Sequence, residues 1–305
     1  MPGRPGGLAR PMDTRDFSHR NQLHPVSRHQ SASALWVLLG SVVILMLAAA
    51  CAEYAPQSSL VDVGGRRLHI SCAGVGAPPV LLDSGLASDN HDWPGVQRRV
   101  SEFTQVCSYD RAGLGRSDPA STPRTSQDAV DDMHALLANA GVAGPVVLVG
   151  HSYGGLNAQL YSARHPENVA GVVLLDSLHP DTLRRARELL GEQEMGLLMS
   201  ALRANLEGVD LVESMDQVQA VGSLGILPLT VIAAGNSQQS AFIDQGLAER
   251  LTASWADLQV ELADLSLVGT HLTAEKSGHC IQCDQPKLVA DAIKDLVKGV
   301  RRDEP

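Results

Sequence analysis

The chain has 305 residues, which is enough for one large α/β domain and an additional segment. Hydrophobic residues make up 44% and charged residues 19%, values that are typical of a globular protein and exclude a chain that is disordered throughout. The net charge of -10 argues against a nucleic-acid-binding protein.

The first 52 residues differ in composition from the rest. Residues 1–33 are rich in Pro, Gly, Arg, Ser and His and are predicted to form a disordered cytoplasmic segment. Residues 34–52 contain no Lys, Arg, Asp or Glu, and about 20 apolar residues span a bilayer. Five arginines precede this run and Glu53 follows it, so the positive-inside rule predicts that residues 53–305 lie outside the cytoplasm.

The apolar run at 34–52 is therefore predicted to be a transmembrane anchor or a signal segment. Cys51 follows Leu47 and three alanines, which resembles the cleavage site of a bacterial lipoprotein with the leucine one residue too early. Lipid modification at Cys51 and a plain anchor both remain open.

Residues 53–305 contain strand patterns that alternate with helix patterns. Strands are predicted within 60–72 on both sides of Gly64-Gly65 and at 79–83, 104–109, 145–149, 169–176, 228–235 and 271–276. Helices are predicted at 126–140, 156–164, 240–265 and 286–300, and residues 177–226 also have helical spacing. This alternation predicts an α/β fold with a doubly wound, mostly parallel sheet, in which the chemistry takes place at the carboxyl ends of the strands.

The motif Gly150-His151-Ser152-Tyr153-Gly154 lies between the strand at 145–149 and the next helix. A G-x-S-x-G sequence between a strand and a helix is the nucleophile elbow, in which a sharp turn exposes the serine hydroxyl. The glycines on either side allow neighbouring backbone to approach closely. The alternative is a glycine-rich turn with an incidental serine.

Four further motifs accompany the elbow. They are Asp110-Arg111-x-Gly113-x-Gly115-x-Ser117, the strand ending at Asp176, Gly278-His279, and Pro286 seven residues after this histidine. Together they resemble the α/β-hydrolase superfamily over residues 60–300. The resemblance implies a serine esterase or lipase-like enzyme with an α/β-hydrolase fold, a helical cap formed by residues 177–226, and no cofactor or metal.

The resemblance assigns the catalytic serine and histidine. Ser152 is predicted to be the nucleophile and His279 the general base, because a serine hydroxyl needs a base within hydrogen-bond reach. His279 follows the last predicted strand, where the family has its histidine. His271, at the start of that strand, is the alternative base.

The acid that orients the histidine is less clearly marked. Many relatives have it after the seventh strand, but here that strand ends in Gly235-Asn236 without a carboxylate. Asp176, at the end of the sixth strand, is therefore the predicted acid, and Asp244 is the alternative.

Two backbone N–H groups are needed to stabilise the oxyanion formed during acyl transfer. The predicted donors are Tyr153, directly after the nucleophile, and Leu86, in the loop after the strand at 79–83. Ser84 replaces the histidine that the family has in this loop. Asp110 and Arg111 are predicted to brace the loop rather than to act in catalysis.

Apolar residues in the predicted cap favour an apolar or amphipathic substrate. Four cysteines remain after Cys51, and their even number in an exported domain permits disulfides without fixing the pairing; they are Cys72, Cys107, Cys280 and Cys283. The Cys280-x-x-Cys283 spacing also fits a redox motif, but a thioredoxin-like context is missing.

The sequence thus predicts a membrane-tethered, extracytoplasmic serine hydrolase that cleaves carboxylic esters through an acyl-enzyme intermediate. Its expected partners are a small-molecule ester and, through the N-terminal segment, the membrane. A serine-type amidase, a peptidase or an acyltransferase on the same fold remains an alternative. A non-catalytic interaction protein with this fold is the alternative of another class.

Overall fold

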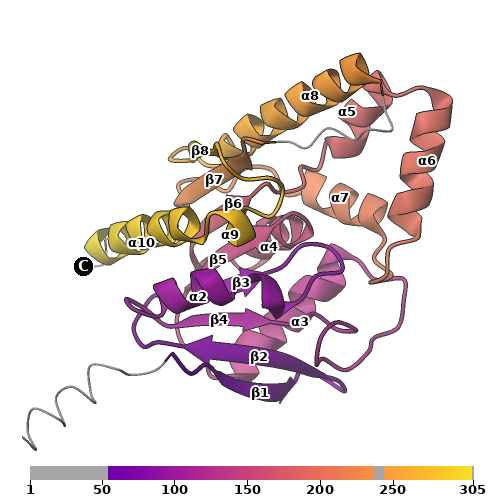
Figure 1. Cartoon of the computed structure of the whole chain (residues 1–305). Coiled ribbons are helices and arrows are strands. Elements are labelled where there is room, and N and C mark those ends of the chain that lie inside the picture. The colour runs from indigo at the N-terminus through magenta and orange to yellow at the C-terminus, as the bar shows by residue number, and fades with distance from the viewer. Residues whose placement is uncertain (1–53, 237–243, 304–305) are drawn as a thin grey trace, which may run out of the picture. The chain divides into compact units, whose positions relative to one another are not determined.

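A computed structural model describes residues 54–236 and 244–303, which contain one eight-stranded sheet (Figure 1). The strands are β1 (Gln57–Asp62), β2 (Arg67–Ala73), β3 (Val80–Asp83), β4 (Val106–Tyr109), β5 (Val146–His151), β6 (Val169–Leu175), β7 (Leu229–Ala234) and β8 (Thr270–Ala274). Their order is β1-β2-β4-β3-β5-β6-β7-β8. Only β2 runs antiparallel to its neighbours β1 and β4 among these described strands, so the predicted mostly parallel sheet is confirmed.

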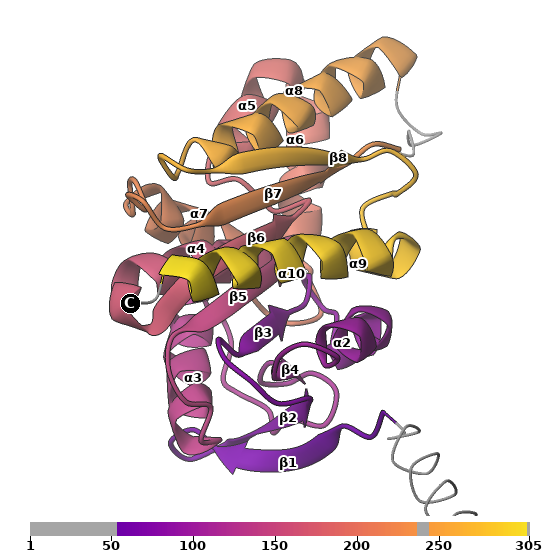
Figure 2. The same ribbon diagram turned by 90° about the vertical axis from the view of Figure 1, so that its left-hand side faces the viewer.

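Helices cover both faces of the sheet (Figures 1 and 2). They are α2 (Pro94–Val100), α3 (Ser126–Asn139), α4 (Tyr153–Arg164), α5 (Thr182–Leu189), α6 (Glu192–Arg203), α7 (Leu211–Gln219), α8 (Gln245–Ala263), α9 (Ile281–Asp284) and α10 (Pro286–Asp303). One hydrophobic cluster joins the sheet to α3, α4, α7 and α8, and a second joins it to α2, α9 and α10. In Figure 2, α2 and α10 lie in front of the sheet.

The central strand β5 shows how the sequence fills both clusters. Val146 and Leu148 belong to the first cluster, whereas Val147 and Val149 belong to the second. Side chains alternate between the faces of a strand, so a strand that is buried on both faces is apolar throughout. This is why the run before the elbow contains no polar residue.

The element predictions agree with the structure, with a few differences. The hairpin turns at Gly64 and Gly65, both of which have positive φ. The helix after the elbow begins at Tyr153 rather than at residue 156, and the segment 177–226 contains α5, α6 and α7. Helix α2 was not predicted, because Pro94-Gly95 is also typical of a turn.

The N-terminal predictions lie outside the described residues: the disordered segment 1–33, the anchor or signal segment 34–52, and Cys51. Among the described residues, no helix has the length and the apolar composition that crossing a membrane requires.

Two disulfides join the cysteines whose pairing the sequence left open. Cys72 of β2 and Cys107 of β4 lie directly opposite each other in the sheet and are bonded. Cys280 and Cys283 form the second disulfide, directly after His279.

Candidate active site

The sharp turn between β5 and α4 holds Ser152 in an unusual backbone conformation, with φ 51° and ψ -114°. The turn is held by two backbone hydrogen bonds: Ser152 N donates to Leu175 O at 3.1 Å, and Gly155 N donates to Ser152 O at 3.0 Å. A non-glycine residue with positive φ is uncommon and is a frequent mark of a functional site. The geometry is therefore that of the predicted nucleophile elbow.

The glycines of the motif are required by close backbone contacts. A Cβ atom at Gly150 would lie 2.4 Å from Gly154 O, and a Cβ atom at Gly154 would lie 2.4 Å from Asp83 O. Only residues without a side chain allow α4 to begin so close to β3 and β5.

Asp176 and His279, predicted from separate motifs, are directly hydrogen-bonded. His279 Nδ1 donates to Asp176 Oδ2 at 2.6 Å. Asp176 Oδ1 accepts hydrogen bonds from Trp255 Nε1 at 2.9 Å and from Ala234 N at 3.1 Å. Burial alone would raise the pKa of Asp176, but these three hydrogen bonds outweigh it and hold the pKa below its usual value.

This arrangement fixes which ring nitrogen of His279 carries the proton. The bond to Asp176 places a proton on Nδ1, so Nε2 of the neutral ring is free to accept a proton. About half of the His279 side chain (54%) is exposed, while Asp176 is buried. A buried carboxylate behind an accessible imidazole is the arrangement that orients a general base.

Ser152 lies next to this pair in the fold. It follows β5 and Asp176 follows β6, and these two strands are neighbours with His151 opposite Leu175. The rings of His151 and His279 pack with centroids 4.7 Å apart. Within residues 54–236 and 244–303, no hydrogen bond joins Ser152 Oγ to His279; in many enzymes this bond tightens only when substrate is bound.

His151 itself is a neutral buried residue. Its Nε2 donates to His279 O at 2.8 Å and so supports the turn that carries His279. Burial, together with the nearby His279, lowers the pKa of His151 to about 4. It therefore remains uncharged at neutral pH.

The two alternative residues lie elsewhere. His271 is near the start of β8, opposite Val231, at the other end of the strand from the turn that carries His279. Asp244 is exposed and is the N-cap residue of α8, where its Oδ1 accepts a hydrogen bond from Leu247 N at 3.1 Å. The fold therefore gives each of these side chains a position away from the Asp176–His279 pair.

The backbone N–H groups predicted to bind the oxyanion make no hydrogen bond among the described residues. Leu86 lies in the loop after β3, and Tyr153 is the first residue of α4. In the described part of the chain, neither Leu86 N nor Tyr153 N donates a hydrogen bond. A Cβ atom at Gly85 would lie 3.5 Å from Ser152 Cβ, so this loop adjoins the serine.

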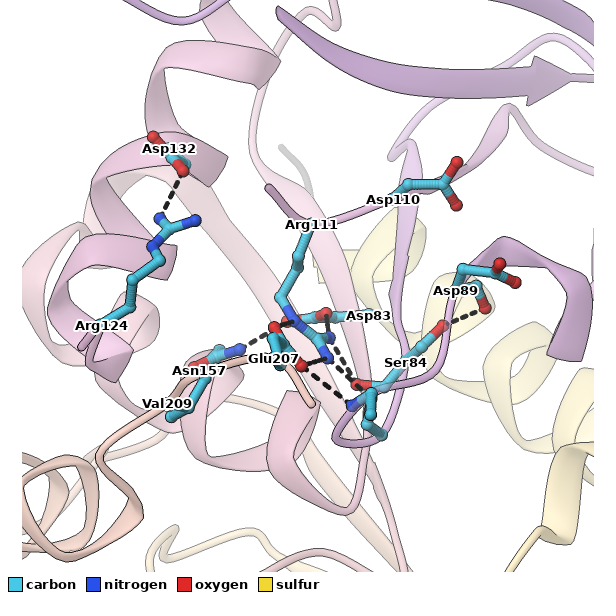
Figure 3. Close-up of polar contacts among 12 residues, drawn as sticks. Asp83, Ser84, Asp89, Asp110, Arg111, Arg124, Asp132, Asn157, Glu207 and Val209 are labelled. Atoms are coloured by element: carbon cyan, nitrogen blue, oxygen red, sulfur yellow. Dashed lines mark hydrogen bonds and ion pairs between the residues drawn. The ribbon is translucent and has the colours of Figure 1, made fainter. Parts of the chain in front are cut away.

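A buried network holds the same loop from behind (Figure 3). Arg111 Nη1 donates to Asp83 Oδ1 and Ser84 O, both at 2.6 Å, and Arg111 Nη2 donates to Gly85 O at 2.7 Å. The expectation that Arg111 braces the loop is thus confirmed. Glu207 pairs with Arg111 Nε at 2.6 Å.

Sequence reasoning missed two partners in the site. Trp255 reaches Asp176 from α8, and Glu207 reaches Arg111 from the segment between α6 and α7. Trp255 is 79 residues from Asp176, and Glu207 is 96 residues from Arg111, so no pattern in the sequence indicated either contact.

Comparison with known proteins agrees with the observed fold. A family model described as "alpha/beta hydrolase fold" matches residues 78–206. An AB hydrolase superfamily protein of Gibberella zeae is 25% identical over 284 residues, covering 73% of this chain and 87% of its own length. Lipase LipV of Mycobacterium tuberculosis is 36% identical over 124 residues, covering 40% of this chain and 46% of the lipase.

Solved structures with the same fold include the haloalkane dehalogenase DatA of Agrobacterium tumefaciens. It has a TM-score of 0.59 and 17% identity, and the alignment covers 81% of this chain and 97% of the dehalogenase. At this identity the likeness concerns the fold alone and does not choose between reactions. The sheet order, the elbow and the family match over residues 78–206 together lead to one conclusion: the chain has the α/β-hydrolase fold.

Proposed function

We propose that this protein is a serine hydrolase that cleaves carboxylic esters, with Ser152, His279 and Asp176 as its catalytic residues. The observation that carries the proposal is the hydrogen-bonded Asp176–His279 pair beside a serine at a nucleophile elbow. The name of the partial relative LipV, a lipase, agrees with this reaction class.

In the proposed reaction, His279 Nε2 takes the proton of Ser152 Oγ as this oxygen attacks the carbonyl carbon of the ester. Leu86 N–H and Tyr153 N–H stabilise the negative charge that forms on the carbonyl oxygen. His279 then gives the proton to the leaving alcohol, and an acyl-enzyme remains.

Water completes the cycle. His279 takes a proton from the water molecule as its oxygen attacks the acyl carbon, and then returns a proton to Ser152 Oγ as the acid leaves. Asp176 stays ionised throughout and stabilises the imidazolium, which agrees with the lowered pKa of its carboxyl group.

An apolar or amphipathic substrate is part of the proposal. The apolar side chains of the predicted cap, among them Met195, Leu198 and Met199, support it. We therefore expect p-nitrophenyl octanoate to have a higher kcat/KM than the acetate. A clear preference for the acetate would contradict this part.

We also propose that residues 34–52 tether the enzyme to a membrane, with the hydrolase domain outside the cytoplasm. The uncharged run and the preceding arginines support this orientation. The Cys72–Cys107 disulfide supports it independently, since structural disulfides persist mainly in oxidising compartments.

Labelling with a fluorophosphonate tests the central proposal, because this reagent modifies only an activated serine. The wild-type protein should be labelled on Ser152 and should hydrolyse p-nitrophenyl esters. The Ser152→Ala variant should show neither, with a loss of several orders of magnitude in kcat and an unchanged circular dichroism spectrum. Esterase activity that survives in this variant would exclude Ser152 as the nucleophile.

A further inference from the structure

The direction of the Leu86 N–H group is set by a contact on the other side of its peptide unit. Arg111 Nη2 donates to Gly85 O at 2.7 Å, and this carbonyl belongs to the same peptide unit as Leu86 N–H. In a planar trans peptide the C=O and N–H groups point in opposite directions. Because Arg111 holds the carbonyl, the N–H group is turned away from Arg111.

The residue after Leu86 is held as well. Ala87 N donates to Glu207 Oε2 at 2.9 Å, and Ala87 has a positive φ of 56°. An alanine adopts this conformation only where the surroundings impose it. Leu86 is therefore held between two fixed points, one at Gly85 O and one at Ala87 N.

Glu207 connects these two points. One carboxylate oxygen accepts from Arg111 Nε at 2.6 Å, and the other accepts from Arg111 Nη2 and from Ala87 N, each at 2.9 Å. Arg111 and Glu207 are both buried, with 4% and 8% of each residue exposed. Figure 3 shows the two side chains meeting behind the loop at Ser84.

Glu207 comes from the predicted cap, in a segment that is anchored to the rest of the domain. Arg124 N donates to Gly208 O at 3.0 Å, and Asp210 N donates to Arg124 O at 2.6 Å. Val209 lies between these two bonds and forms an isolated parallel bridge with Arg124. The backbone that directly follows Glu207 is therefore tied to Arg124, just before α3.

We propose that Glu207 and Arg111 are positioning residues that aim Leu86 N–H at the oxyanion, so that the helical cap contributes to transition-state stabilisation through this loop. The inference rests on the proposed serine hydrolase function. It assigns a role to a residue of the cap that touches neither the substrate nor the catalytic residues.

Glu207→Gln is the first test. One carboxylate oxygen is replaced by an NH₂ group, which would face either the Arg111 guanidinium or Ala87 N, both of them donors. Loss of one oxyanion donor costs about 10²- to 10³-fold in kcat, so a misdirected donor should lower kcat by about 10- to 100-fold. KM for p-nitrophenyl butyrate should change by less than about twofold, because the donor acts mainly in the transition state.

A transition-state readout separates this role from a general loss of stability. An alkyl trifluoromethyl ketone forms a tetrahedral adduct with the serine and places negative charge at the oxyanion position. Its inhibition constant should rise in Glu207→Gln by the same factor by which kcat/KM falls. A variant that is merely less stable would have a lower Tm and would bind this ketone as the wild type does.

Asp132→Asn is the matched control. Asp132 is also a buried carboxylate, with 4% of the residue exposed, and it pairs with Arg124 next to the segment that carries Glu207. It makes no contact with the loop from Ser84 to Ala87. Its substitution should lower Tm and leave kcat and ketone inhibition within about threefold of wild type, which is the range expected for a site outside the donor network. An equal loss of kcat in this control would show that loosening of the cap, and not the donor, is responsible, and would overturn the inference.

A second variant covers the case in which Glu207→Gln does not fold. Glu207→Asp keeps the buried negative charge but is one methylene shorter, so it cannot hold Arg111 and Ala87 N together. We expect a folded protein with the same pattern of a lowered kcat, an unchanged KM and weakened ketone inhibition. Wild-type values in this variant would refute the inference even if Glu207→Gln is insoluble.

The wild-type protein in the same assays separates failure of the proposed function from failure of the inference. If it is not labelled by fluorophosphonate and cleaves no ester, the proposed function and the inference fail together. If it is labelled and active, and the Glu207 variants match it in kcat and ketone inhibition, only the inference fails.

Discussion

Backbone strain is concentrated at the candidate site. Among the described residues, three non-glycine residues have positive φ: Ala87 at 56°, Ser152 at 51° and Asp176 at 39°. Each such residue costs about 1–3 kcal/mol and persists only when its surroundings impose the conformation. One lies in the loop with the predicted oxyanion donor, one is the predicted nucleophile and one is the predicted acid.

The acid can be identified by paired substitutions. Asp176→Asn should lower kcat by about 10³- to 10⁴-fold with little change in KM, because the amide would favour the wrong tautomer of His279. Asp244→Asn should leave kcat unchanged, since Asp244 caps α8 and asparagine is an equally good N-cap residue. The assignment of Asp176 is wrong if the two variants behave the other way round in steady-state kinetics.

The lowered pKa of His151 predicts a pH dependence of stability. The unfolded chain binds a proton at this histidine near the usual histidine pKa of 6.5, whereas the folded protein does so only at a pKa of about 4. The unfolded state therefore binds more protons in this range, and the free energy of unfolding falls as the pH is lowered from 6.5 to 4. The contribution of this one group is about 3 kcal/mol.

Urea denaturation at several pH values measures this effect. In His151→Gln, an amide can still donate to His279 O but does not titrate. Its free energy of unfolding should therefore change less between pH 6.5 and 4 than that of the wild type. Parallel curves for the two proteins would mean that His151 is not the titrating group.

At the residue scale, the sequence predicted those residues of the site that lie in motifs or at strand ends. Asp176 was found because carboxyl ends of neighbouring parallel strands meet at one edge, and the structure indeed joins it to His279. Glu207 could not be found in this way. Its partner Arg111 is 96 residues away, and only the folded chain shows which of the acidic residues is buried against it.

At the level of elements, the contact between the elbow and β3 decides where α4 can begin. A Cβ atom on residue 154 would lie 2.4 Å from Asp83 O. This oxygen belongs to the backbone of a buried strand and cannot easily move aside. The packing of α4 on the sheet thus depends on the absence of one side chain.

Gly154→Ala should therefore destabilise the domain, although alanine favours helix formation. Overpacking of this kind costs about 1–3 kcal/mol, and the shift of α4 should also lower kcat because Tyr153 N–H moves with the helix. Gly196→Ala in α6 is the control, since no atom lies within 4 Å of a Cβ there. Alanine at this helical position should stabilise the protein by up to about 1 kcal/mol, as urea denaturation would show.

The prediction of elements from the sequence succeeded where one pattern dominates. Buried parallel strands are continuous apolar runs, and each of the predicted ones is present. Helix α2 was not predicted, because proline followed by glycine is typical both of a turn and of the first turn of a helix. What makes it a helix is the burial of Val96 and Val100 against the second hydrophobic cluster, which is a tertiary effect.

At the scale of the whole molecule, the compact hydrolase unit begins at Tyr54. Its two hydrophobic clusters are made by residues of this unit. A protein without residues 1–51 should accordingly fold, remain in solution and keep the esterase activity of the full chain. Size-exclusion chromatography and p-nitrophenyl ester hydrolysis test this; aggregation together with loss of activity would show that the N-terminal residues belong to the fold.

The Cys72–Cys107 disulfide closes a covalent ring around part of the candidate site. The two cysteines are 35 residues apart, and the chain between them contains β3, the loop with Ser84 to Ala87, and α2. A protease that cuts this loop would break one peptide bond without dividing the molecule. The cut protein would migrate as one species on a non-reducing gel and would separate into two fragments only after reduction. A non-reducing gel would therefore not reveal that the loop with the predicted oxyanion donor had been cut.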